Sequence, residues 1–281
     1  MKIALITSLE KPDGTFDDQL LRDSLVKSGH TAEFRVWNGA TDWLSYETCL
    51  LRSTWDYHRN VTKFLSWLQT TAKFTRVLNP YETVRWNTDK SYLSDLGTRG
   101  IPVIPTQVFT EQSKALTAIA KLLEKGRVVV KPAVSASGEL THRLDSESKL
   151  EYVVGEILER SALVLQPYIE TIVEEGELSL VFFKISGKTQ YSHSVLKTAK
   201  KGDFRVQEEF GGTVEKVEAP DDSIAVARNC LETMPQKWTY ARVDLVDWTT
   251  SPRVGEVELI EPELFFRHHP PALDLMKQAL G

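Results

Sequence analysis

Three acidic side chains near the C-terminus have the clearest potential for chemistry. Asp244 lies in an apolar segment at 240–248, and Glu256 and Glu258 alternate with apolar residues at 253–261. On a strand Glu256 and Glu258 point to the same face, and a hairpin of the two segments places Asp244 opposite one of them. Three such carboxylates repel one another unless a cation neutralises them, and oxygen ligands suit Mg²⁺ or Mn²⁺. The pattern predicts a metal site, with a solvated acidic sheet face as the alternative.

Two lysines are candidate phosphate ligands. Lys131 ends an apolar run and is followed by a loop of small residues at 133–138, whose backbone N–H groups can bind phosphate oxygens beside the cation. Lys90 could supply a second cation. The structural alternatives are a strand-end lysine that reaches water, and a helix that begins at a cap on Asn87 or Thr88. The candidate loop contacts are Ser135, Ser137 and Gly138.

The segment 162–169 could bind an adenine base, although these residues alone favour an ordinary strand and turn. An apolar strand at 162–167 runs into a hinge, where backbone groups can bind the edge of a base, and a carboxylate after Gly176 can accept hydrogen bonds from ribose hydroxyls. A strand followed by an ordinary turn has the same pattern. The candidate nucleotide contacts are Gln166, Tyr168, Ile169 and Glu177.

Two further segments are candidates for binding a small anionic group. The run 51–58, which contains Arg52 and Asp56, follows a predicted buried strand at its carboxyl end, where open α/β sheets bind ligands. Arg205 lies in a polar loop from Gly202 to Gly212 that could close over an anionic site. A structural cluster of aromatic residues and a mobile surface loop are the respective alternatives.

The elements that must position these residues change in character along the chain. Strands and helices alternate in the first part, which predicts a small open α/β sheet and an N-terminal α/β domain at 1–87. A larger α+β part with mostly antiparallel strands is predicted at 88–281. Strands are expected at 3–7, 32–37, 48–52, 76–78, 103–109, 127–131, 162–167, 177–185, 189–197, 240–248 and 253–261, and helices at 16–28, 146–160 and 222–234.

The composition excludes several classes of function. The chain has 281 residues, 41% of them hydrophobic, and 34 basic against 39 acidic residues give a charge of -5. A nucleic-acid partner would need a clustered basic excess, and no apolar run is long enough for a membrane span. Cys49 and Cys230 alone do not form a disulfide framework, and the first residues lack the features of a signal peptide. We therefore expect a cytoplasmic protein; the oligomeric state stays open, a homodimer included.

In their order and spacing, these segments resemble the ATP-grasp superfamily and, within it, the glutathione-synthetase-like enzymes. The resemblance runs from about residue 50 to 262. The sequences Arg-Ser-Thr-Trp-Asp-Tyr at 52–57 and Asn-Thr-Asp-Lys at 87–90 are most similar to a bacterial branch that includes the O-ureido-serine cyclo-ligase of cycloserine biosynthesis. Glutathione synthetases have asparagine where this chain has Glu258, and Ser-Pro where it has Glu261-Pro262. The added carboxylate suggests a substrate amine with more positive charge nearby.

The resemblance implies an ATP-grasp fold with an N-terminal substrate domain, a flap subdomain at about 101–170 and a metal-bearing subdomain at about 171–281. ATP would lie between the last two, with its phosphates against Lys90 and Lys131 and with Mg²⁺ on the three carboxylates. A carboxylate of a small amino-acid-like substrate would form an acyl phosphate, which an amine then captures. The expected catalytic residues are Lys131 and Arg205, and the expected substrate ligands are Arg52, Asp56 and Glu261. The rivals are a phosphotransferase with this fold and an ATP-binding regulator without catalysis.

These assignments predict that ATP stabilises the protein only together with Mg²⁺ or Mn²⁺, because three clustered carboxylates otherwise repel the triphosphate. Thermal unfolding with ATP, with and without a chelator, measures this dependence. Equal shifts of Tm in the two conditions would contradict the metal site.

Overall fold

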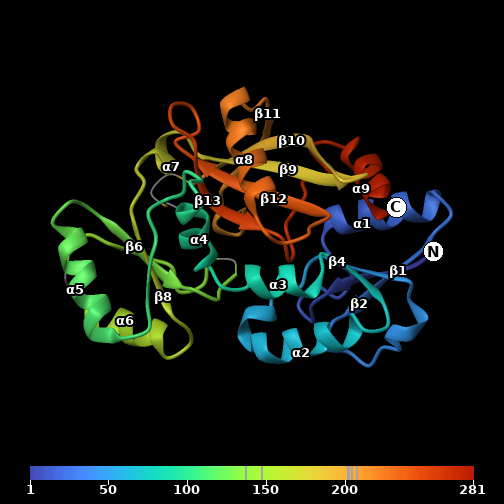
Figure 1. Ribbon diagram of the computed structural model, residues 1–281, viewed down its shortest axis with the longest axis horizontal. Coiled ribbons are helices and arrows are strands. Elements are labelled where there is room, and N and C mark those ends of the chain that lie inside the picture. The colour runs from blue at the N-terminus through green and yellow to red at the C-terminus, as the bar shows by residue number, and fades with distance from the viewer. Residues whose placement is uncertain (137, 147, 201–202, 204, 207) are drawn as a thin grey trace.

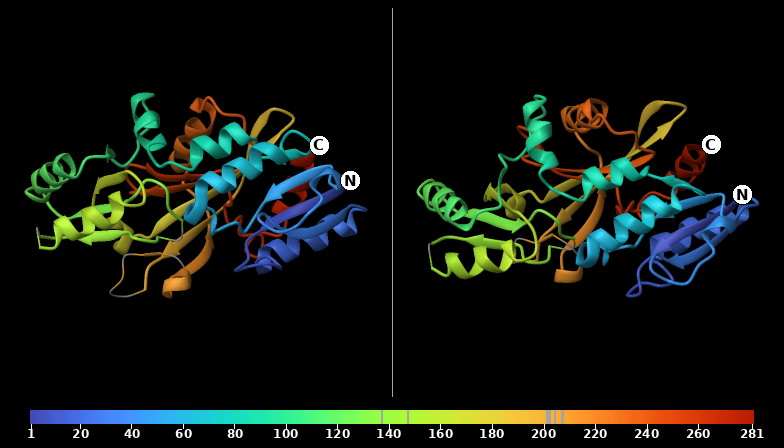
Figure 2. Two further views of the ribbon diagram at one scale, coloured as in Figure 1. Left: turned by 90° about the horizontal axis from the view of Figure 1, so that it is seen from below. Right: turned by 60° about the horizontal axis from the view of Figure 1, so that its bottom comes forward.

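The computed structural model describes residues 1–136, 138–146, 148–200, 203, 205–206 and 208–281. The described chain forms three sheets, with four, five and four strands. The five-stranded sheet lies between the other two, which occupy opposite ends of the molecule (Figures 1 and 2). Ser137 and Gly202, which belong to two of the predicted loops, fall outside the described residues.

The N-terminal sheet is parallel, with the strand order β2-β1-β3-β4. Its strands alternate between two cores: Ile3 and Leu5 pack on the side of α1, and Ala4 and Ile6 on the side of α2. The predicted alternation of strand and helix is confirmed here, although Phe16 is 62% exposed and does not join the buried face of its helix. The elements are β1 (Lys2–Thr7), α1 (Phe16–Lys27), β2 (Thr31–Val36), η1 (Trp43–Ser45), β3 (Thr48–Leu51), η2 (Tyr57–Asn60), α2 (Val61–Thr71) and β4 (Arg76–Leu78).

The second sheet, green in Figure 1, is antiparallel in the order β5-β8-β6-β7, and α5 and α6 pack against it. The strand expected at 103–109 is shorter in the structure: only its end forms β5, and Val103 makes a single bridge to Val254. The helices and strands in this stretch of the chain, from residue 81 to 167, are α3 (Tyr81–Asn87), α4 (Tyr92–Thr98), β5 (Gln107–Phe109), α5 (Gln112–Leu123), β6 (Val128–Pro132), β7 (His142–Leu144), α6 (Leu150–Leu158) and β8 (Leu163–Pro167).

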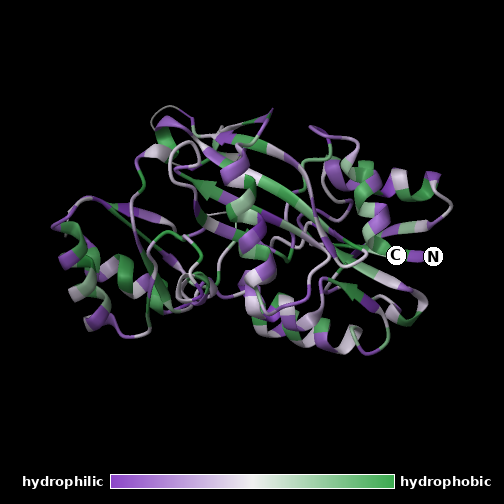
Figure 3. Cartoon of the chain, turned by 45° about the horizontal axis from the view of Figure 1, so that its top comes forward, coloured by the Kyte–Doolittle hydropathy of each residue, from purple (hydrophilic) through white to green (hydrophobic). Residues whose placement is uncertain are grey.

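The central sheet is antiparallel, with the order β11-β10-β9-β12-β13. Both faces are buried: Leu180 and Phe182 point to the core beside α8, and Val181 and Phe183 to the core that includes α9. β9 is accordingly rich in hydrophobic residues, whereas β10 carries many polar ones. Figure 3 shows hydrophobic and hydrophilic bands that alternate along the helices. The elements are α7 (Thr171–Glu174), β9 (Glu177–Ile185), β10 (Lys188–Thr198), η3 (Glu208–Phe210), β11 (Thr213–Val217), α8 (Asp221–Thr233), β12 (Tyr240–Val246), β13 (Arg253–Glu258) and α9 (Ala272–Leu280).

The two hairpins expected in the C-terminal half are confirmed, with ends that differ from the expected ones by up to three residues: β13 ends at Glu258 and not at Glu261. β9 pairs with β10, and β12 with β13, both antiparallel. Ser186 and Gly187 join β9 to β10 with φ angles of 49° and 77°, which is the left-handed conformation that a two-residue hairpin turn of type I′ requires.

Two polar side chains hold the outer edge of β13, where the strand has no further partner strand among the described residues. The amide of Asn87 donates to the carbonyl of Val257 and accepts from the N–H of Leu259, each at 2.8 Å. The hydroxyl of Tyr92 donates to Val257 O at 3.1 Å and accepts from Val257 N at 3.0 Å. These bonds replace a strand and fix the residues on both sides of Val257. Asn87 is the last residue of α3, and Thr88 caps its C-terminus. The alternative interpretation of the sequence, in which a helix begins at a cap on Asn87 or Thr88, is therefore wrong.

None of the described helices is both long and apolar enough to cross a membrane. The domain boundary near residue 87 and the limits of the two subdomains remain predictions.

Replacing Asn79 with alanine should destabilise the fold. Its fully buried amide donates to the carbonyls of Tyr240 and Leu259, each at 2.8 Å, and accepts from the N–H of Thr239. The backbone groups of Thr239, Tyr240 and Leu259 would lose these hydrogen bonds, which should lower the free energy of unfolding by about 2–4 kcal/mol in urea titrations. Asn229→Ala, on the exposed face of α8, should change it by less than about 0.5 kcal/mol. Equal effects of the two variants would contradict the bracing role of Asn79.

Candidate functional site

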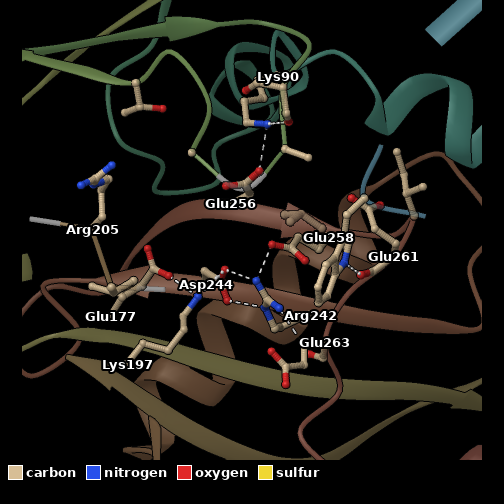
Figure 4. Close-up of a pocket in the computed structure, with 18 of the residues that line it drawn as sticks. Lys90, Glu177, Lys197, Arg205, Arg242, Asp244, Glu256, Glu258, Glu261 and Glu263 are labelled. Carbon is tan, nitrogen blue, oxygen red and sulfur yellow. Dashed lines mark hydrogen bonds and ion pairs between the residues drawn. The ribbon is translucent and has the colours of Figure 1, made fainter. Parts of the chain in front are cut away.

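A pocket of about 390 Å³ lies where residues from all three sheets meet. Charged residues of both signs line it (Figure 4), and they come from β6, β9, β10, β12, β13 and the connecting segments, among them the one between α3 and α4 that carries Lys90. It contains most of the predicted site residues that the structure describes: Lys90, Lys131, Ser135, Gly138, Glu177, Arg205, Asp244, Glu256, Glu258 and Glu261.

A buried ion-pair network occupies the floor of the pocket. Arg242 and Asp244 are two residues apart on β12 and so share a face, and two guanidinium nitrogens of Arg242 lie 2.9 and 3.0 Å from the carboxylate oxygens (Figure 4). Lys197 lies 3.1 Å from the same carboxylate, and the hydroxyl of Ser179 donates to it at 2.6 Å. Burial alone would raise the pKa of Asp244, but these cations and hydrogen bonds hold that pKa well below its ordinary value.

The pKa values of two neighbouring carboxyl groups are raised instead of lowered. Glu258 lies opposite Arg242 in the strand register and pairs with it, yet burial together with Asp244 and Glu256 raises the pKa of Glu258 to about 7. Burial also raises the pKa of Glu177, whose carboxylate lies 2.5 Å from Lys197. The floor therefore holds more negative charge than its own cations neutralise, and an added cation would be favoured there.

The opposite wall presents the two lysines predicted for phosphate. Lys90 lies 3.1 Å from the carboxylate of Glu256 and donates to the carbonyl of Ser135 at 2.8 Å. Burial and the charge of Lys90 lower the pKa of Lys131. Burial opposes ionisation of Glu256, but the charges of Lys90 and Lys131 outweigh it and lower the pKa of Glu256. Two partly uncompensated cations side by side form a site for an anion with several oxygens, such as a polyphosphate.

The predicted metal ligands fit Mg²⁺ by type, although they are engaged with protein cations. Asp244, Glu256 and Glu258 lie on paired strands and offer only hard oxygen donors, which Mg²⁺ prefers together with phosphate oxygens and water. Across the residues described, no group of three or more His, Cys, Asp or Glu side chains converges closely enough to hold a metal ion. The ion pairs of Arg242 and Lys90 would have to yield for the carboxylates to converge.

The residues predicted to bind the base have other contacts and do not line the pocket. The amide of Gln166 donates to the hydroxyl of Thr106 at 2.9 Å, and Ile169 packs against Ile104 and Val246. The ring of Tyr168 lies against the guanidinium groups of Arg127 and Arg143. Ile172, just beyond this segment, does line the pocket. A base-binding role for Gln166, Tyr168 and Ile169 stays a prediction.

Arg52 and Asp56 also lie outside the pocket lining, whereas Trp55 and Tyr57, between and beside them, are part of it. The guanidinium of Arg52 binds Asp18 at 2.9 Å, and Asp56 accepts a hydrogen bond from the indole of Trp37 at 2.7 Å. Each side chain thus has a partner in the N-terminal part of the chain, and Arg52 also donates to the carbonyl of Pro262 at 3.0 Å, so neither points into the pocket lining.

Arg205, in the predicted closing loop, lines the pocket. It is held by Asp203 at 2.8 Å and lies 3.7 Å from the centre of the Phe210 ring.

The sequence reasoning missed several residues of the pocket. Arg242 could have been found, because its place two residues before Asp244 on a strand puts both on one face. Lys197 faces Glu177 across the hairpin, a pairing that depends on an exact register. Lys11 and Glu263 lie in loops, and their sequence contexts carry no signal.

The sequence and the structure of the chain are similar to those of known enzymes. Residues 3–79 match the family model described as "D-cycloserine synthetase DcsG, N-terminal domain". Over 278 residues the chain is 32% identical to the cycloserine biosynthesis protein DcsG of Streptomyces lavendulae, an alignment that covers 93% of this chain and 92% of that protein.

The crystal structure of D-cycloserine synthetase DcsG superimposes with a TM-score of 0.88 at 31% identity, over 100% of this chain and 98% of that one. A RimK-domain ATP-grasp protein of Sphaerobacter thermophilus gives 0.71 at 18% identity, covering 99% and 98%. The D-alanine–D-alanine ligase of Bacillus anthracis gives 0.69 at 18% identity, covering 100% and 97%. The last two support the fold alone.

The network on the floor predicts strong coupling between Arg242 and Asp244. Arg242→Met leaves a buried carboxylate with fewer partners and should lower the free energy of unfolding by about 3–5 kcal/mol. Adding Asp244→Asn removes that charge, so the double variant should lose less than the sum of the two single variants. Urea unfolding of the four proteins measures the coupling.

Arg85→Met is the control for this cycle, because Arg85 forms an exposed pair with Glu82 at 3.0 Å and should contribute less than about 1 kcal/mol. Additive losses at Arg242 and Asp244 would show that the network is not a unit.

Proposed function

Because the chain belongs to the ATP-grasp ligases, in the family of the cycloserine biosynthesis protein DcsG, we propose that it joins a carboxylate of a small amino-acid-like substrate to an amine through an acyl phosphate. The observation that carries this proposal is the pocket with two walls of opposite charge: Lys90 and Lys131 on one side, and the carboxylates of β12 and β13 on the other. A Mg²⁺–triphosphate carries the two complementary charges: the phosphates suit the lysines and the metal suits the carboxylates.

On the nucleotide side, Lys90, Lys131 and the backbone of the loop with Ser135 and Gly138 would bind the phosphates. Asp244, Glu256 and Glu258 would hold Mg²⁺, which supplies neutralisation of the charge on the transferred phosphoryl group. The pKa of Glu258 is raised to about 7, which supports this role, because a bound cation would stabilise the ionised carboxylate. When a cation takes over the carboxylates, Arg242 becomes available to an anionic group.

On the substrate side, an oxygen of the substrate carboxylate bonds to the γ-phosphorus of ATP as the bond to ADP breaks. The amine then attacks the acyl carbon, loses a proton, and displaces inorganic phosphate. Arg205 is the group proposed to steady the acyl phosphate, and its loop to exclude water. Holding amine and acyl phosphate together supplies much of the acceleration.

The acidic end of the pocket supports an amine-bearing substrate. Glu261 and Glu263 line it beside Trp55, and burial with the charge of Glu258 raises the pKa of Glu261 well above its ordinary value. A substrate ammonium group would restore the charge balance there. The name of the relative, a cycloserine synthetase, denotes a cyclic product, so the proposal extends to ligation within one molecule.

Hydroxylamine tests the intermediate. With ATP, Mg²⁺ and an amino-acid panel that includes ureido and aminooxy analogues, the protein should form a hydroxamate and release ADP. Glu256→Gln should keep the fold and lower the rate by at least about 100-fold, because the charge opposite the lysines and the metal ligand are lost together. The matched control is Glu215→Gln, at an exposed position of β11 in the same sheet, which should keep the parental rate.

A stable phosphoester in place of hydroxamate would contradict the ligase mechanism and favour phosphotransfer. Parental rates in Glu256→Gln would contradict the role of the acidic strand.

A further inference from the structure

A histidine of the N-terminal part contacts the loop that follows β6. His58 lies in η2, and its ring nitrogen Nε2 lies 2.8 Å from a carboxylate oxygen of Glu139. The two residues are 81 positions apart in the chain, so their contact joins two separate parts of the fold. The other ring nitrogen, Nδ1, is buried and has no hydrogen-bond partner in the part of the chain that the structure describes. The polar role of this side chain is therefore its contact with Glu139.

Glu139 has two cationic or hydrogen-bonding partners, and the one on the N-terminal side is the better shielded from water. The side chain of His58 is 9% exposed, whereas that of Arg160, which lies 2.7 Å from the second carboxylate oxygen, is 57% exposed. The hydrogen bond from His58 is the largest cause that lowers the pKa of Glu139 below its ordinary value. Because water screens the exposed pair more strongly, the contact with His58 should hold Glu139 more firmly than the contact with Arg160.

The backbone next to Glu139 is the part of the pocket proposed to bind phosphate. Ser135, Ala136 and Gly138 line the pocket, and Glu139 is the next residue of the chain. The N–H of Glu139 donates to the carbonyl of Ala136 at 3.1 Å, and Gly138 has a φ angle of 68° in this turn. The position of Glu139 thus influences that of the N–H groups beside it.

The loop is attached on two sides. On one side Lys90 donates its backbone N–H to the carbonyl of Ala133 at 2.9 Å and its Nζ to the carbonyl of Ser135 at 2.8 Å. On the other side Ala136 packs against the hydrophobic core of the N-terminal part that includes Tyr57. The pair of His58 and Glu139 is the polar contact of this second attachment.

The two attachments differ in what a bound triphosphate would do to them. The Nζ of Lys90 is proposed to bind phosphate, and this role competes with its bond to the loop. The imidazole of His58 and the carboxylate of Glu139 have no proposed contact with the ligand, so their pairing can persist when the nucleotide is bound.

We propose that His58 is a positioning residue, which acts through Glu139 to hold the loop after β6 where its backbone N–H groups bind phosphate oxygens. The inference rests on the proposed function in taking this loop as a phosphate ligand. It gives the N-terminal part of the chain a role in nucleotide binding, and it links that role to Tyr57, the neighbour of His58 that lines the pocket.

The test compares the parent protein with His58→Asn and His58→Gln. A glutamine amide can donate from about the position of Nε2, whereas the shorter asparagine amide does not reach Glu139. By isothermal titration calorimetry, His58→Asn should bind the Mg²⁺ complex of the ATP analogue AMP-PNP about five- to tenfold more weakly, the loss expected for one hydrogen bond to a charged group. Its affinity for adenosine, which has no phosphate, should stay unchanged. His58→Gln should bind AMP-PNP within about twofold of the parent.

Hydrogen exchange of the ligand-free proteins measures the position of the loop independently of the nucleotide. The backbone amides at 138–141 should exchange at least about threefold faster in His58→Asn than in the parent, and at the parental rate in His58→Gln.

Glu139→Ala provides a second, independent variant. It should weaken AMP-PNP binding as His58→Asn does, and the double variant should lose no more than either single one, because both remove the same contact. Arg160→Met is the matched control: it removes the exposed partner of Glu139 and should change AMP-PNP binding by less than about twofold.

Three results would overturn the positioning role. They are parental binding of AMP-PNP in His58→Asn, equal weakening of AMP-PNP and adenosine, and additive losses in the double variant. A His58→Gln variant as weak as His58→Asn would do the same, since the restored hydrogen bond would then have no effect on the phosphates.

The outcomes separate this inference from the proposed function. If the parent binds AMP-PNP and forms hydroxamate while the exchange at 138–141 is the same in all variants, the role of His58 is wrong and the ligase function stands. If the exchange depends on His58 and AMP-PNP binding follows it, but no substrate yields ADP or hydroxamate, the role of His58 stands and the ligase function is wrong.

Discussion

The structure depends on one electrostatic constraint: several carboxylates are buried on adjacent strands and must be neutralised. Arg242 and Lys197 neutralise Asp244, and Lys90 lies against Glu256. These contacts depend on the register of β12 with both β9 and β13. A shift of β12 by one residue would turn the side chains of Arg242 and Asp244 to the opposite face of the sheet. Under the proposed function, the same excess of negative charge would favour the binding of a cation.

Polar side chains from outside the central sheet maintain that register. Asn87 and Tyr92 complete the hydrogen bonds of β13, and Asn79 bridges the start of β12 and the segment after β13. Each of them comes from the chain between the first sheet and the second. The segment that carries Lys90 is therefore anchored to the strand that carries Glu256, so the two walls of the pocket are positioned by one set of contacts.

The sequence was sufficient to predict features with a short-range signal. The hairpins, the open α/β first sheet, and the shared face of Glu256 and Glu258 follow from alternation and turn residues, and the ATP-grasp family follows from the order of the motifs. The position of Arg52 did not, because its partner Asp18 lies 34 residues away and the contact depends on how α1 packs. Likewise, the expected strand at 103–109 has strand-like residues, but pairing with β8 stabilises only its end.

The two ends of the pocket have different roles in the proposed function. Under the proposed function, the lysines and the carboxylates of β12 and β13 would bind a nucleotide and its metal. The segments that follow β1 and β3 contribute Lys11, Trp55 and Tyr57 to the pocket lining, beside Glu261.

The central claim is that the buried carboxylates exchange protein cations for a metal when the nucleotide binds. A crystal structure with Mg²⁺ and a non-hydrolysable ATP analogue measures this directly. The account predicts Mg²⁺ within ligand distance of oxygens from Asp244, Glu256 or Glu258 and of the phosphates, with the guanidinium of Arg242 withdrawn from at least one carboxylate. A nucleotide bound elsewhere, or phosphates beside Lys90 and Lys131 with all the ion pairs of Arg242 intact and no metal on the acidic strands, would contradict it.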